Sequence, residues 1–63
     1  MTATSALTVL VVDDHMLMRV TLTQYLRKLG FSEIETAING EDAHNKVETK
    51  LLVGSPYDII FVD

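Results

Sequence analysis

Two short apolar runs, each ending at a carboxylate, constrain this 63-residue chain more than any other feature. The first covers residues 9–12 and leads into Asp13 and Asp14, and the second covers residues 59–62 and leads into Asp63. Continuous runs rich in Val and Ile are typical of strands buried on both faces of a parallel sheet. If these strands are parallel neighbours, the three carboxylates meet at the carboxyl edge, where open α/β sheets bind ligands. The sequence therefore predicts an acidic site at one edge of a parallel sheet.

The segment after the first strand (residues 7–12) has the period of a helix, which we expect over residues 16–29. Its apolar side chains recur at the spacing of one helical face: Met18, Leu22, Tyr25, Leu26 and Leu29. No Ser or Thr cap precedes this helix, but Gly30 is suited to end it and Phe31 to fold back onto Leu26. Met16 and Met18 are expected to fill gaps in the core.

The second half of the chain repeats the alternation of strand and helix. Ile34, Thr36 and Ile38 alternate with Glu33, Glu35 and Ala37, which predicts a short strand over residues 33–38 that is exposed on one side. A helix is expected over residues 40–52, with Ala43, Val47 and Leu51 on its apolar face, and a third strand over residues 57–62. The order β-α-β-α-β predicts a parallel α/β sheet with strand order 2-1-3 and one helix on each face.

Composition excludes several classes of function. The net charge of −4 argues against a nucleic-acid surface, which needs clustered Lys and Arg. Cysteine is absent, which excludes disulfides and thiolate sites. No apolar run is long enough to span a membrane and residues 1–8 do not resemble a signal peptide, so we expect a cytoplasmic protein with a disordered leader at residues 1–6.

The three carboxylates need a counter-charge if they converge. Two unit charges about 4 Å apart repel by roughly 4 kcal/mol at an effective dielectric constant of 20. Mg²⁺ would relieve this repulsion, since it prefers carboxylates together with water and phosphate oxygens, and a carboxylate beside it can accept a phosphoryl group. The alternative is that Asp13 and Asp14 serve only as turn or helix-capping residues.

The chain resembles a response-regulator receiver domain of the CheY-like kind, a doubly wound, flavodoxin-like fold. The resemblance rests on the motifs at residues 9–14, 18–19, 26, 29–31, 39–43 and 58–63, and it covers residues 7–63 as the N-terminal half of a receiver. It implies that Asp63 is the phosphoacceptor for a sensor histidine kinase or phosphotransfer protein. It also implies that Asp13 and Asp14 bind Mg²⁺ together with Asp63, in a signalling switch and not an independent enzyme.

The resemblance also implies residues that this sequence does not contain. The family's switch Ser or Thr, its lysine and its switch aromatic all fall after the position of Asp63, so we expect the natural chain to continue. The alternative function is a non-phosphorylated pseudo-receiver that dimerises or binds a partner through its exposed third strand. A flavodoxin-like cofactor binder is disfavoured because no phosphate-cradling loop is present.

Other polar residues are expected to have ordinary structural roles. His15 is predicted to be a solvent-facing loop residue and His44 a partly buried packing residue, neither of them a ligand. The remaining charged side chains of the second helix are expected to be solvated: Lys46, Glu48 and Lys50.

Overall fold

A three-stranded parallel sheet with one helix on each face forms the structure, a computed structural model that describes residues 6–62. In chain order the elements are β1 (Thr8–Val12), α1 (Met16–Lys28), β2 (Glu33–Ala37), α2 (Gly40–Leu52) and β3 (Ile59–Val62). The strands lie in the order β2-β1-β3, and both pairings are parallel. The predicted α/β class, element order and strand order are therefore confirmed.

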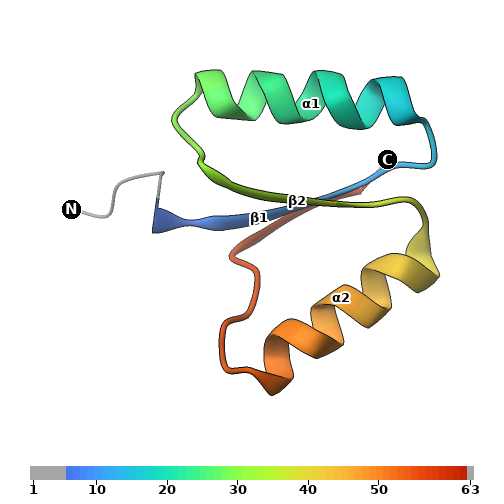
Figure 1. Ribbon diagram of the computed structural model, residues 1–63, viewed down its shortest axis with the longest axis vertical. Coiled ribbons are helices and arrows are strands. Elements are labelled where there is room, and N and C mark those ends of the chain that lie inside the picture. Colours follow the sequence, from blue (N-terminus) through green and yellow to red (C-terminus); the bar gives the residue numbers. More distant parts are fainter. Residues whose placement is uncertain (1–5, 63) are drawn as a thin grey trace.

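Figure 1 shows the sheet edge-on between α1 and α2, which gives three layers. The described part of the chain measures 34 × 30 × 12 Å. Strands lie about 4.8 Å apart in a sheet, so the 12 Å dimension corresponds to the breadth of three strands. Among residues 6–62, β2 and β3 each pair with another strand on one side only.

The core is organised on the two faces of β1, the central strand. Val9 and Val11 face α1 and pack with Leu26. Leu10 and Val12 face the other way and pack with Ala37. All four β1 side chains at positions 9–12 are buried because a helix covers each face, as the continuous apolar run predicts.

Strand β2 is covered on both faces, whereas the alternation of its side chains predicted one exposed side. Ala37 is fully buried, and Glu35 is only half-exposed. Both residues face α2. Ile38, expected inside the strand, lies outside it and is 51% exposed.

Helix α1 buries less of its apolar stripe than predicted. Leu26 is buried and Leu22 packs beside it, but Tyr25 and Leu29 are more than half exposed. The two methionines expected in the core are also exposed, Met16 by 71% and Met18 by 44%. A sheet only three strands wide offers too little surface to cover the whole stripe.

The end of α1 follows the prediction. Gly30 has a left-handed backbone with φ of 105°, and the Phe31 amide donates to the Leu26 carbonyl at 3.1 Å. Phe31 also packs against the cluster that contains Leu26. At its start, His15 occupies the N-cap without a side-chain capping bond, as expected from the missing Ser or Thr.

Helix α2 has the predicted bounds, and two side-chain hydrogen bonds cap its start. Asn39 Oδ1 accepts from the Asp42 amide at 2.8 Å, and Asp42 Oδ2 accepts from the Ile38 amide at 3.0 Å. This second bond, together with the charges of Lys46 and Arg19, holds the pKa of Asp42 below its usual value. His44 corrects a prediction: its side chain is 76% exposed and lies 3.1 Å from Glu48 Oε2.

Strand β3 begins at Ile59, two residues later than predicted. The Asp58 carboxylate and amide bind the backbone of Thr8, each at 2.8 Å, and this closes the sheet at its start. The side chains of Ile60, Phe61 and Val62 are 46%, 40% and 73% exposed, respectively. Within residues 6–62 no helix has the length and apolar character needed to cross a membrane.

Candidate functional site

The carboxyl edge of the sheet is built from strand ends at one level. Val12 is in register with Ala37 on one side and with Val62 on the other. Asp13, the next residue, keeps its amide on β2, where it donates to the Ala37 carbonyl at 3.1 Å. The Asp13 side chain is only 1% exposed, so this carboxylate is held at the sheet edge and not in solvent.

Asp14 and His15 complete a compact cluster with Asp13. His15 Nδ1 lies 3.0 Å from Asp13 Oδ1 and 2.8 Å from Asp14 Oδ1. One ligand atom from each residue lies within 4.8 Å of the others, a grouping that can hold a metal ion. His15 is 69% exposed, as predicted for a solvent-facing residue, but its ring turns toward both carboxylates and not away from them.

The chemistry of these donor atoms suits a divalent cation. With octahedral geometry and bonds of about 2.1 Å, adjacent ligands are separated by about 3.0 Å. His15 Nδ1 lies at hydrogen-bond distance from both carboxylate oxygens, and the three candidate ligand atoms all lie within 4.8 Å of one another. Carboxylate oxygens are ligands for hard cations, and an imidazole nitrogen widens the choice to transition metals.

Asp63, the predicted phosphoacceptor, lies outside the described residues. The predicted acidic site is therefore described for Asp13 and Asp14, which the structure brings together at the expected edge.

Arg19 is a residue of this site that the sequence analysis missed. Its Nη1 donates to the Asp13 carbonyl at 2.9 Å, so α1 holds the loop that carries the carboxylates. A signal was present in the sequence, since Arg19 lies in the first turns of a helix that follows Asp13 and Asp14 directly.

Arg19 also lines a groove of about 320 Å³ between α1 and β2. The other residues that line it are four from α1 and one from β2: Met16, Val20, Thr23, Gln24 and Thr36.

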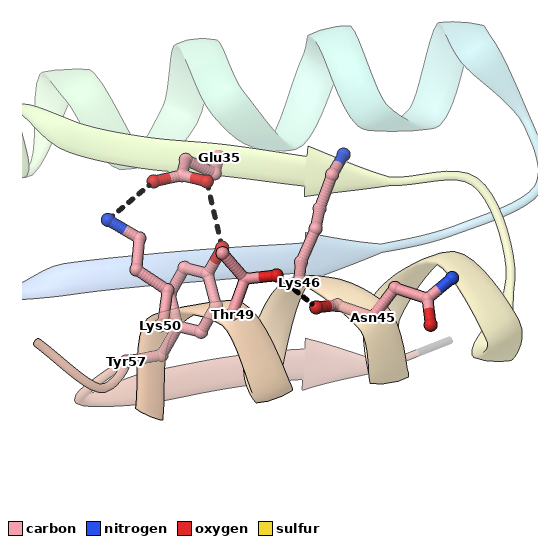
Figure 2. A pocket seen from close by; sticks show the side chains of 6 residues that line it. All are labelled: Glu35, Asn45, Lys46, Thr49, Lys50 and Tyr57. Carbon is pink, nitrogen blue, oxygen red and sulfur yellow. Dashed lines mark hydrogen bonds and ion pairs between the residues drawn. The ribbon is translucent and has the colours of Figure 1, made fainter. Parts of the chain in front are cut away.

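A second pocket lies between α2 and β2 (Figure 2), with a volume of about 190 Å³. Both oxygens of Glu35 are engaged there: Oε1 accepts from the Tyr57 hydroxyl at 2.8 Å, and Oε2 lies 3.0 Å from Lys50 Nζ. Lys50 Nζ also lies 5.7 Å from the centroid of the Tyr57 ring.

Lys46, the other lysine of this pocket, also has partners in the fold. Its Nζ donates to the Thr36 carbonyl and lies 3.4 Å from Asp42 Oδ2. The expectation that these lysines are merely solvated was therefore wrong.

The pocket changes the acidity of two of its members. Burial alone would raise the pKa of Glu35, but hydrogen bonds from Tyr57 and Lys50 outweigh it and hold that pKa below its usual value. Burial, and then the neighbouring Glu35 carboxylate, raise the pKa of Tyr57 to about 12. The polar groups of Glu35, Lys50 and Tyr57 are all partnered with one another. This arrangement is typical of a structural contact, here one that joins α2, β2 and the segment before β3.

No protein-family model, curated protein or solved structure matches this chain.

Proposed function

We propose that this chain forms the opening βαβαβ segment of a CheY-like receiver domain in a two-component phosphorelay, with Asp63 as the phosphoacceptor. One observation carries the proposal: a buried Asp13 and an adjacent Asp14 sit at the carboxyl end of the central strand in a parallel sheet of order 2-1-3. Asp63 follows Val62 by one peptide bond, and Val62 is the register partner of Val12. This register supports the proposal that Asp63 acts together with Asp13 and Asp14.

The proposed reaction is an in-line phosphoryl transfer. A carboxylate oxygen of Asp63 attacks the phosphorus of a phosphohistidine on a sensor kinase or phosphotransfer protein. The new O–P bond forms as the P–N bond breaks, and the donor imidazole leaves with the electron pair of that bond. Such transfers depend mainly on positioning and on neutralising the charge of the phosphoryl oxygens.

Mg²⁺ is the cation that this proposal requires. Asp13 and Asp14 would hold it through carboxylate oxygens, and when bound it supplies the charge neutralisation for the incoming phosphoryl group. Asp13 suits this role because burial and a backbone bond to Ala37 fix its position before any cation binds.

Intact-mass spectrometry tests the proposal directly. We expect the protein to gain one phosphoryl group from acetyl phosphate with Mg²⁺, and to gain none in EDTA or as the Asp63→Asn variant. Asp13→Asn should also abolish the gain, whereas Glu41→Gln, at the exposed start of α2, should leave it intact. A phosphoryl group that appears equally in Asp63→Asn would refute the assignment.

The exposed edge of β3 supports a second candidate function, an interaction module that pairs with a second copy of itself. Residues 59–62 carry no charge, and Ile60, Phe61 and Val62 are all substantially exposed. An uncharged, unpaired edge strand is a template for strand addition. In analytical ultracentrifugation, such a dimer would persist in EDTA and in Asp63→Asn but dissociate in Ile60→Lys. Leu52→Lys, at an 82% exposed position on α2, is the matched control.

A further inference from the structure

The backbone of Asp13 is held from two directions. Its amide donates to Ala37 of β2 at 3.1 Å, and its carbonyl accepts from Arg19 Nη1 of α1 at 2.9 Å. The side chain adds a third restraint, because Oδ1 accepts from the His15 amide at 2.9 Å. Asp13 is therefore anchored to the sheet, to the helix and to its own loop.

Asp14 has no comparable burial, since its side chain is 77% exposed. The placement of its carboxylate depends on the course of the loop backbone between Asp13 and the helix. Arg19 is the side chain of α1 that reaches back across this loop to the Asp13 carbonyl. It thus bridges the helix to the segment that carries both carboxylates.

We propose that Arg19 is a positioning residue for the cation site formed by Asp13 and Asp14. This inference rests on the proposed function, because it presumes that the two carboxylates bind a divalent cation. Outer-shell groups that hydrogen-bond to metal ligands hold them in their binding geometry, and their loss typically lowers metal affinity by about 10- to 100-fold. Arg19 binds the backbone of Asp13 and not its carboxylate, so we expect an effect at the lower end of this range.

The positive charge of Arg19 has the opposite effect on cation affinity from its hydrogen bond, so the two roles can be told apart. A guanidinium beside a cation site repels the cation, so removing the charge alone would tighten binding. Removing a positioning hydrogen bond would weaken it. The direction of change in affinity therefore separates the two roles.

The experiment is a titration of the full chain with Mg²⁺ and with Mn²⁺ at constant ionic strength, followed by amide chemical shifts and by paramagnetic broadening. Arg19→Met removes the charge and the donor but keeps an apolar stem beside Met16 and Val20. We expect it to weaken cation binding by about 10-fold. Arg19→Lys, which keeps the charge and one donor, should restore part of the affinity.

Arg27→Met is the matched control, because it removes the same charge from the last turn of α1. We expect its cation affinity to equal or slightly exceed that of the wild type. Thermal unfolding of each variant in EDTA, without cation, separates an effect on the site from an effect on the fold. If Arg19→Met does not fold, the comparison of Arg19→Lys with the wild type tests the inference.

Two results would overturn the inference, and they differ in what else they affect. If the wild type binds Mg²⁺ or Mn²⁺ at these carboxylates but Arg19→Met binds equally well or more tightly, Arg19 is not a positioning residue and the proposed function stands. If the wild type binds neither cation while Asp13→Asn behaves identically, the cation site fails and the proposed function fails with it.

Discussion

Replacing Tyr57 with phenylalanine removes one oxygen atom and, with it, the hydrogen bond that ties the segment before β3 to β2. The lost bond is an O–H donor to a charged carboxylate at 2.8 Å. Hydrogen bonds to charged groups contribute about 1.5–3 kcal/mol when buried, and both side chains here are partly exposed, so we expect a loss of about 1 kcal/mol. In a domain of this size that corresponds to a fall in Tm of about 4–8 °C.

The pH dependence of this loss follows from the two pKa shifts. Glu35 has a folded pKa below its usual value of 4.5, so its contribution is present above that value and is lost as the pH falls through the folded pKa. Tyr57 has a folded pKa raised from 10.0 to about 12, so its contribution is present below pH 10.0 and is lost as the pH rises toward 12. The difference in stability between wild type and Tyr57→Phe should therefore be flat near neutrality and shrink at both extremes.

Urea unfolding followed by circular dichroism measures this difference. A double-mutant cycle with Glu35→Gln isolates the coupling between the two side chains, and Tyr25→Phe, at a 59% exposed tyrosine of α1, is the matched control. The reasoning is refuted if Tyr57→Phe matches the wild type at neutral pH. It is also refuted if the difference persists unchanged in acid, below the pKa of Glu35.

Three further substitutions test the core and the caps. Leu26→Ala removes the buried anchor of α1 and should cost about 2–5 kcal/mol, enough to unfold most of the chain by circular dichroism, whereas Leu52→Ala at an exposed position should cost almost nothing. Thr23→Val should raise the free energy of unfolding by roughly 1 kcal/mol, because the Thr23 hydroxyl is buried without a hydrogen-bond partner among residues 6–62. The urea midpoint should rise accordingly, and a lower midpoint would contradict this. Asn39→Ala removes the cap of α2 and should cost about 1 kcal/mol, with a matching loss of amide protection in the first turn of α2.

Local signals in the sequence predicted the elements and their order well. Residues 9–12 read as a strand buried on both faces, and a helix covers each of those faces. Gly30 and Phe31 marked the end of α1, while the bounds of α2 were predicted residue for residue. These successes share a cause: strand and helix periods, caps and turns are set by neighbours only a few residues apart.

The same sequence signals failed wherever the amount of covering surface mattered. The apolar stripe of α1 was correctly read as one helical face, yet Met18, Tyr25 and Leu29 remain exposed. The alternation in β2 predicted one exposed side, yet Ala37 is completely buried beside α2. Periodicity gives the direction of a side chain, but only the packing of layers gives what lies in that direction.

The candidate site divides in the same way. The adjacency of Asp13 and Asp14 at a strand end was readable from the sequence, because the chain itself brings them together. The contact between Glu35 and Tyr57 spans 22 positions, and the bond from Arg19 to the Asp13 carbonyl spans six across a loop and a helical turn. Such contacts depend on how α1 and α2 pack on the sheet. The sequence alone therefore determined that Asp13 and Asp14 lie together at the end of a strand, and the tertiary structure decided that Arg19, Lys50 and Tyr57 hold the surrounding elements in place.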